Sequence, residues 1–266
     1  MNGALFEPSF FGHYSEPVGP FKIVASFLGL IDKANPPTWS IFVELIASAL
    51  LPFFVLYARD LTRAAVLSAG LLVVSFAMPL LPETHLFLYR WPAFMVNFAV
   101  GILALHVALQ LRPQLARLPA SVSLVASVGL FFVLMNGRAL MDAAGYTYSG
   151  HADPVTNLFE MAVSMALIVL LLEAAPKLAT TRPLKILGDL SYGIYLIHFP
   201  MLFTVAAGLV LLFGADLLAA HSDLFALSLA IVTTLAVLVA SALAWRFLEK
   251  PMIDAGRRLS NRIDGR

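Results

Sequence analysis

The sequence predicts an all-α membrane protein, a bundle of about seven helices that cross the bilayer. Of its 266 residues, 60% are hydrophobic and only 12% are charged, whereas soluble domains carry about 25% charged residues. Apolar runs of about seventeen residues or more recur along the whole chain, and each can cross a hydrocarbon core of about 30 Å. The charged residues lie mainly between these runs, which favours a polytopic membrane protein over a soluble one.

Residues that begin or end helices agree with the positions of the apolar runs. Pro92 and Pro119 stand where the third and fourth spans are expected to begin. Asn136 follows the fourth run, and Ser222-Asp223 is expected to cap the last helix. The spans are expected at residues 39–57, 64–81, 92–110, 119–135, 155–172, 189–212 and 223–247.

Basic residues are distributed unequally between the two sides of the predicted bundle. Most of the 17 Lys and Arg residues lie in one alternating set of connections, namely loops 58–63, 111–118 and 173–185 and the tail from Arg246. The opposite set holds only Lys22, Lys33, Arg90 and Arg138. Because Lys and Arg are enriched in cytoplasmic loops, the C-terminus is expected in the cytoplasm and the N-terminus outside.

This topology divides the chain into three parts. Residues 1–38 are expected to be an external segment whose apolar stretch, residues 21–31, is too short to span and lies at the interface. Residues 39–247 form the transmembrane domain. In the basic cytoplasmic tail, residues 248–266, Pro251 is expected to end the helix before an amphipathic stretch on anionic lipid headgroups. No signal peptide precedes the external segment, as expected if earlier spans are missing.

Glu44 is an acidic residue inside a predicted span that contains no basic residue. Ser40, Glu44 and Ser48 recur every four residues and form one polar stripe on an apolar helix. A charged group near the bilayer centre costs about 2.5–3.5 kcal/mol, so it usually faces a cavity or a partner. Glu44 is therefore a candidate general acid or base, proton relay or cavity wall, and the alternative is a protonated carboxyl hydrogen-bonded between helices.

A similar polar stripe occurs on the fifth predicted span. Asn157, Glu160 and Ser164 share one face of that helix, at a depth similar to that of Glu44. Asn97, near the outer end of the third span, is expected to face the same space. The same functional and structural alternatives apply to Glu160.

His198 lies near the middle of the sixth predicted span, beside two tyrosines. Tyr192, Tyr195 and His198 are three residues apart and occupy about 120° of one helix face. His198 is a candidate base or a contact for an acyl chain or headgroup, although spacing alone favours a core histidine. His106 is interpreted as a core histidine.

Several classes of function are excluded or disfavoured. The chain has no Cys, so a thiolate nucleophile and a Cys-based metal site are excluded. No His and acid have metal-ligand spacing on one helix, so no metal is expected. The basic residues lack the clustering of a nucleic-acid-binding surface, and no phosphate-binding loop is present. We therefore expect neither a nucleic-acid partner nor a bound cofactor.

Three segments together resemble the acyltransferase 3 family of membrane O-acyltransferases. The stretch "PTWSIFVELIASALLPFF" is similar to the family's W-S-x-x-x-E span that ends in proline. The stretch "LGDLSYGIYLIHFPML" is similar to its L-G-x-x-S-Y-x-x-Y-L-x-H-x-P segment, and "AWRFLEKPMIDAGRRL" to its closing R-F-x-E-x-P. A fourth stretch, "RWPAFMVNFAVGIL", is similar to its Arg-led span. The order and spacing of these segments also agree.

The resemblance implies a membrane enzyme that transfers an acyl group, commonly acetyl from acetyl-CoA, to a sugar hydroxyl of a cell-surface glycan. The family has about ten spans with both ends in the cytoplasm, so the present spans correspond to its last seven. Its first span carries a basic residue and a His that are central to transfer, followed by an Arg-x-x-Arg element near the CoA; neither has a match here. The resemblance implies that Glu44 orients such a base or holds the acceptor.

The candidate site residues follow from the stripes and the resemblance together. The catalytic candidates are Glu44 and His198. The candidates for substrate binding are Trp39, Ser40, Tyr192, Tyr195, Arg90, Asn97 and Glu160. The expected partners are the bilayer of the cell membrane, an acyl-CoA co-substrate and a carbohydrate acceptor. Two alternatives stay open: an inactive remnant or subunit, and a transporter of a small anion or glycan with Glu44, Glu160 and His198 as a proton relay.

Overall fold

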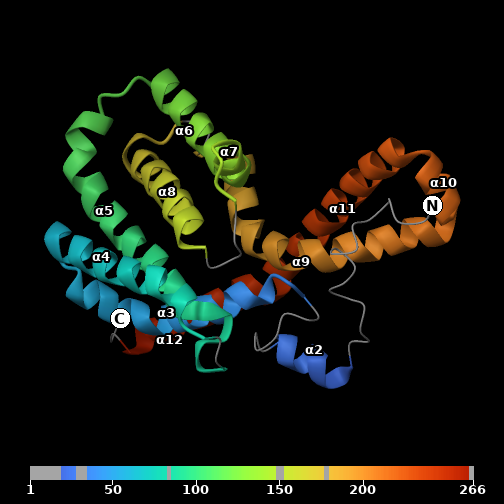
Figure 1. Cartoon of the computed structure of the whole chain (residues 1–266), viewed down its shortest axis with the longest axis horizontal. Helices are drawn as coiled ribbons and strands as arrows, with labels where there is room; N and C mark the ends of the chain where they lie inside the picture. Colours follow the sequence, from blue (N-terminus) through green and yellow to red (C-terminus); the bar gives the residue numbers. More distant parts are fainter. Residues whose placement is uncertain (1–18, 28–34, 83–84, 148–152, 177–179, 264–266) are drawn as a thin grey trace. The chain divides into compact units, whose positions relative to one another are not determined.

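The computed structural model describes residues 19–27, 35–82, 85–147, 153–176 and 180–263 (Figure 1). Within these ranges the chain forms helices and turns but no strand. The α-helices are α2 (Pro20–Phe27), α3 (Thr38–Tyr57), α4 (Leu61–Ala77), α5 (Met95–Leu115), α6 (Ala120–Met135), α7 (Gly137–Ala143), α8 (Pro154–Ala174), α9 (Arg182–Phe213), α10 (Ala215–Ala220), α11 (Ser222–Ala244) and α12 (Lys250–Ile263). Short 3₁₀-helices occupy Met78–Leu80 and His85–Phe94.

The helices confirm an all-α, multi-pass membrane protein. In the described part of the chain, six helical segments are long and apolar enough to cross a membrane. A seventh is counted if α6 and α7, which meet at a bend of 70°, form one broken span. Most spans lie within about five residues of their predicted positions, but the helix predicted at 189–212 already begins at Arg182, and the helical segment predicted at 223–247 continues to Arg262. Their orientation in the membrane stays a prediction.

The chain divides into two compact units, each described by itself. The terminal unit comprises Met1–Ile41 and Arg182–Arg266, and the central unit comprises Phe42–Thr181. In the terminal unit, α9 and α11 pack as a hairpin that α10 connects (Figure 1). Gly193 permits the close approach, since a Cβ there would lie 3.2 Å from Ser241 Cβ and 3.1 Å from Glu249 Oε1.

The central unit is built around α8, which lies between α5 and α6 (Figure 1). Ala104 and Ala108 of α5 are fully buried and pack with Val169 of α8. Small side chains let the two helices approach closely, which is the main route to helix packing in a membrane. At one end of this contact, the Arg112 guanidinium lies 3.2 Å from the Glu173 carboxylate.

The start of α8 is fixed by Asp153. Its carboxylate accepts a hydrogen bond of 2.8 Å from the Thr156 backbone N–H, and Pro154 occupies the first turn of the helix. The Tyr146 hydroxyl donates to both oxygens of the same carboxylate, at 2.9 and 2.8 Å. This hydrogen bond to Asp153, reinforced by burial and by the carboxylate charge, raises the pKa of Tyr146.

Two of the predicted helix starts are wrong. Pro92 lies inside the 3₁₀-helix His85–Phe94, and α5 begins three residues later, at Met95. Ser222 is already helical, and the residue that precedes α11 is His221, which makes no side-chain cap hydrogen bond. At Pro92 the neighbouring backbone is already in 3₁₀ geometry, and at Ser222 a turn at His221 precedes the helix, so the local signal marks the region of the start but not its residue.

Pro251 does not end the helix, contrary to the prediction. A π-helical turn, Trp245–Glu249, connects α11 to α12, and the Lys250 N–H bonds to the Trp245 carbonyl. Proline lacks an N–H, and its ring crowds the carbonyl four residues earlier. The wider π turn accommodates this, so the chain stays helical through Pro251, which lies in the first turn of α12.

Much of the predicted external segment lies outside the described residues, namely residues 1–18 and 28–34. The part that the structure describes contains α2, a helix of 8 residues. At 1.5 Å per residue this helix is too short to cross a bilayer. Its place outside the membrane stays a prediction.

Candidate functional site

In the terminal unit, a hydrogen bond joins the segment before α3 to α9. It is made to a backbone carbonyl of α9 that has no donor within the helix. Pro200 lies inside α9 and has no N–H to donate to the carbonyl of Leu196, four residues earlier. The side-chain Nδ2 of Asn35 donates to this carbonyl at 2.8 Å. Asn35 therefore replaces the backbone hydrogen bond that Pro200 removes, and it joins the W-S-x-x-x-E segment to the H-x-P segment.

A second hydrogen bond joins the same two segments. The Tyr195 hydroxyl donates to Ser40 Oγ at 2.9 Å, and the Ser40 hydroxyl donates to the Pro37 carbonyl at 3.1 Å. Both Tyr195 and Ser40 are candidates from the sequence, 155 residues apart. The structure thus brings together two of the predicted substrate-binding residues within one unit.

His198 lies one turn beyond Tyr195 on α9, and the hydrogen-bond partners of its ring determine its tautomer. Its Nδ1 is 2.5 Å from the Tyr195 carbonyl and 3.2 Å from the Ile194 carbonyl. Because carbonyl oxygens only accept, Nδ1 carries the proton and the neutral ring has its lone pair on Nε2. The ring also packs against Phe199, with centroids 4.7 Å apart, so the imidazole is oriented with Nε2 as its basic atom.

Three other candidates from the sequence lie on α3 and α9. Trp39 is half-buried in the first turn of α3, and Tyr192 is exposed on α9. Glu44 lies one turn after Ser40 on the same face of α3 and is exposed. A side chain that is exposed on a membrane-spanning helix of the isolated chain contacts lipid, another segment or a ligand when the protein is in the membrane.

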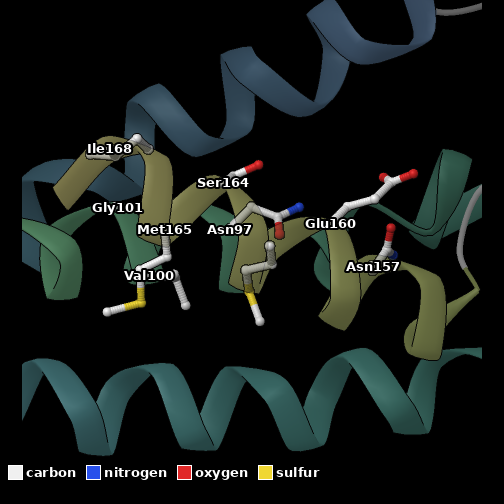
Figure 2. A pocket seen from close by; sticks show the side chains of 9 residues that line it. Asn97, Val100, Gly101, Asn157, Glu160, Ser164, Met165 and Ile168 are labelled. Carbon is white, nitrogen blue, oxygen red and sulfur yellow. The ribbon is translucent and has the colours of Figure 1, made fainter. Parts of the chain in front are cut away.

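In the central unit, α5 and α8 enclose a partly open cavity of about 200 Å³. Its polar lining consists of Asn97, Asn157, Glu160 and Ser164, and its other lining residues are Val100, Gly101, Met161, Met165 and Ile168. Figure 2 shows Asn157 and Glu160 at one end and Val100, Met165 and Ile168 at the other. The stripe predicted on α8 therefore faces the same space as Asn97. Glu44 is not among the residues that line this cavity.

Arg138 of α7 provides a counter-charge for Glu160. Its Nε lies 3.5 Å from Glu160 Oε1, and the two side chains are 55% and 34% exposed. The backbone of Gly137 lies against Phe159, because a Cβ at Gly137 would come within 3.0 Å of that ring. The bend between α6 and α7 thus brings a cation to the polar end of the cavity.

Two further predicted residues are placed by local structure. His106 Nε2 is 2.9 Å from the Ala58 carbonyl, so His106 donates a hydrogen bond within the bundle, as a structural histidine does. Among the non-glycine residues that the structure describes, Arg90 is the one with a positive φ, at +51°. Such a conformation is uncommon outside glycine, and it lies within the 3₁₀-helix that precedes α5.

Sequence reasoning missed two residues, one in each unit. Asn35 precedes two prolines and the first motif, and the sequence places it only within the external segment 1–38. The signal that could have found it is Pro200, since a proline inside a helix frees the carbonyl four residues earlier and requires a donor from elsewhere. Arg138 was counted only as a loop charge, because its approach to Glu160 depends on the bend at Asn136-Gly137.

Each arrangement has a chemistry that it can perform. Around Tyr195 and Ser40, hydroxyl groups and an imidazole with a basic Nε2 can bind an alcohol and accept its proton. The cavity between α5 and α8 can bind a ligand that has a polar end and an apolar end. The two arrangements belong to different units of the chain.

Comparisons with known proteins give one finding. The family model of acyltransferase 3, described as an acyltransferase domain, matches residues 4–246 of the chain. Comparisons with curated proteins and with solved structures gave no match.

Proposed function

Because this chain belongs to the acyltransferase 3 family, we propose that it transfers an acyl group, acetyl in the simplest case, from acyl-CoA to a hydroxyl of a cell-surface carbohydrate. Membership of the family implies transferase activity and an acyl donor, and the helices make the chain a multi-pass membrane protein. The identity of the donor, the carbohydrate acceptor and the location in the cytoplasmic membrane are the proposed part.

The observation that carries the proposal is the hydrogen bond between Tyr195 and Ser40, 2.9 Å long. It joins the two segments whose residue types fit binding of an alcohol, and it lies one helical turn from His198. Hydroxyl groups that already exchange hydrogen bonds with each other can exchange them with a sugar hydroxyl as well. This supports the terminal unit as the place where the acceptor binds.

His198 is proposed as the general base of the transfer. The acceptor oxygen attacks the thioester carbonyl carbon while Nε2 of His198 takes the hydroxyl proton. The carbon–sulfur bond then breaks, and the imidazolium returns the proton to the departing thiolate. The products are an O-acyl ester and the free thiol of CoA. Donation from Nδ1 to the Tyr195 carbonyl holds the ring with Nε2 as the acceptor of the proton.

From the W-S-x-x-x-E motif alone, Glu44, which lies one turn after Ser40 on α3 and belongs to the central unit, is proposed to hold the acceptor. A carboxylate accepts hydrogen bonds from sugar hydroxyl groups without donating any, so it selects for an alcohol. In a low-dielectric membrane region, such a bond is stronger than in water. Trp39 and Tyr192 would complete the binding surface with apolar contact.

The test uses the purified chain reconstituted in proteoliposomes with labelled acetyl-CoA and cell-envelope glycan. We expect acyl ester to form, and His198→Gln to lower the rate about 100-fold or more, the range of general-base catalysis. Glu44→Gln should raise KM for the glycan more than it lowers kcat. His106→Gln is the matched control, because that histidine bonds to the Ala58 carbonyl and should leave transfer within about twofold.

Three results would contradict the proposal. Transfer by the His198→Gln variant at the wild-type rate would remove His198 as the base. A folded wild-type chain without transfer would indicate an inactive remnant or a subunit. Flux of an anion or glycan into the vesicles without acyl-CoA would indicate a transporter.

A further inference from the structure

The polar end of the cavity between α5 and α8 includes a buried hydrogen-bond donor without a partner in the described ranges. Asn157 Nδ2 is buried and has no hydrogen-bond partner among the residues that the structure describes. A buried N–H without an acceptor is destabilising, so a ligand with an acceptor atom at this place would bind more tightly than one without it. The polar end therefore selects a ligand that carries a carbonyl or ether oxygen.

The charge at the polar end is already balanced. Arg138 lies 3.5 Å from Glu160, so the carboxylate does not require a cationic ligand. A neutral head is thus favoured over an ammonium or a phosphate. None of the residues that line the cavity is aromatic, so a sugar ring has no flat apolar face to stack on. These features favour a neutral carbonyl compound over a carbohydrate.

The opposite end of the cavity suits a flexible alkyl chain. Met161, Met165 and Ile168 follow at helical spacing along α8, and α5 contributes Val100 and Gly101. Methionine side chains are flexible and adapt to ligands of different shape. A Cβ placed on Gly101 would meet nothing within 4 Å, so the absence of a side chain there leaves open space at the apolar end.

The volume agrees with an acyl group longer than acetyl. Pockets for complete small molecules measure about 300–1,000 Å³, and this cavity of about 200 Å³ is smaller. Since liquid water takes about 30 Å³ per molecule and a methylene group takes slightly less, the cavity has room for several carbons.

We propose that the cavity between α5 and α8 binds the acyl group of the donor thioester and sets its length, with Gly101 as a specificity-determining residue. The acyl carbonyl accepts the hydrogen bond of Asn157 Nδ2, and the alkyl chain lies along Met165 and Ile168. The inference rests on the proposed acyl transfer and extends it to acyl groups of several carbons. An ester lipid of the bilayer offers the same chemistry, and the experiment separates the two sources.

The experiment measures binding without turnover. The full chain in nanodiscs is titrated with N-acetylcysteamine thioesters from acetyl to decanoyl, and each Kd is obtained from the ligand-dependent shift of thermal unfolding. We expect affinity to increase with chain length up to several carbons and then to fall. Gly101→Leu fills the open space and should shift the optimum to shorter acyl groups while leaving the acetyl thioester unchanged.

Two further variants sharpen the result. Asn157→Leu removes the donor and should weaken every thioester about tenfold, but not the matching alkane-thiol ethers that lack a carbonyl. Gly70→Leu is the control, because a Cβ at Gly70 also meets nothing within 4 Å and this residue does not line the cavity. Its length profile should match that of the wild type.

The outcomes distinguish this inference from the proposed function. An identical length profile in Gly101→Leu and Gly70→Leu would remove the acyl site, even if transfer is observed. If binding depends on acyl length and Gly101→Leu shifts the optimum to shorter acyl groups, but no transfer is observed, the acyl site is supported and the proposed function is wrong. If native mass spectrometry shows an ester lipid that no thioester displaces and that Gly101→Leu expels, the cavity is a lipid site and the inference is wrong.

Discussion

The Leu196 carbonyl shows how a single backbone atom connects two segments far apart in the sequence. Pro200 leaves it without a helical donor, and Asn35 supplies one at 2.8 Å. The Pro200 residue also lies two positions after His198, so the unpaired carbonyl arises next to the proposed base. A helix with alanine at this position would need no contact from the start of α3.

Asn35→Leu should lower the free energy of unfolding by about 1–3 kcal/mol, because the Leu196 carbonyl would be left without a partner. The same change should cost less in a Pro200→Ala background, where the backbone N–H of residue 200 can bond to that carbonyl. A double-mutant cycle from unfolding in mixed micelles measures the difference, and we expect a coupling energy of about 1–2 kcal/mol. Equal costs in the two backgrounds would show that Asn35 and Pro200 act independently.

At the level of single residues, the sequence identified groups by type but not by partner. Tyr195 and Ser40 were both expected to bind substrate, and the hydrogen bond between them was not foreseen. The reason is physical, because a hydroxyl can bond to almost any polar neighbour. Asn97 and the Asn157 stripe were expected to face one space, and they do, since helix periodicity alone determines a face.

At the level of elements, Gly193 sets how closely α9 and α11 approach. A Cβ at this residue would lie 3.2 Å from Ser241 Cβ, which is closer than the two can comfortably pack. Gly208, on the same helix, has nothing within 4 Å of such a Cβ. The two glycines therefore form a matched pair in which only one has a packing role.

Gly193→Ala should destabilise the chain by about 1–3 kcal/mol through overpacking. Gly208→Ala should stabilise it by up to about 1 kcal/mol, because alanine is the better helix former. Thermal unfolding of both variants in the same detergent measures the two signs. Stabilisation by Gly193→Ala would mean that the helices can separate without loss.

The turn between α7 and α8 should respond to alkaline pH through Tyr146. Its hydrogen bond to Asp153 raises the pKa of Tyr146, and the neutral hydroxyl is the form that donates. The stabilisation is therefore complete below the ordinary tyrosine pKa of about 10 and is lost as pH rises through the raised value. The wild type should melt above Tyr146→Phe at neutral pH, and this gap should close in strongly alkaline buffer.

A control keeps this comparison specific. Tyr57→Phe removes a hydroxyl from an exposed position on α3 and should leave the melting temperature close to that of the wild type at every pH. A gap between the wild type and Tyr146→Phe that does not change with pH would mean that the ring, and not its hydroxyl, stabilises the turn.

At the level of the whole molecule, the orientation in the membrane is the main prediction that follows from charge alone. The chain has no Cys, so single cysteines can be added without altering any native residue elsewhere. Ala144→Cys lies after α7, on the predicted outer side, and Ser260→Cys lies in α12, on the predicted inner side. In intact cells a membrane-impermeant maleimide should label only Ala144→Cys. Labelling of Ser260→Cys alone would reverse the orientation.

Composition and apolar runs were sufficient to predict an all-helical protein with six to seven spans, because each run must match the thickness of the bilayer. They were not sufficient for irregular helical geometry. The bend between α6 and α7 and the π turn at Trp245–Glu249 depend on how the backbone accommodates Asn136-Gly137 and Pro251. These irregular places also determine where Arg138 lies and where the tail points.

The π turn has a consequence for the length of the chain. A π turn amounts to one extra residue in an α-helix, so everything after it is out of phase with α11 by about 100°. Deleting one residue within Trp245–Glu249 would thus do more than shorten the protein by one step. It would rotate α12 by about 100° about its own axis, so that the edge with Met252 and Leu259 and the opposite edge with Arg257 and Arg258 would each turn by more than a quarter turn relative to α11. For this region, the phase of the helix matters more than its length.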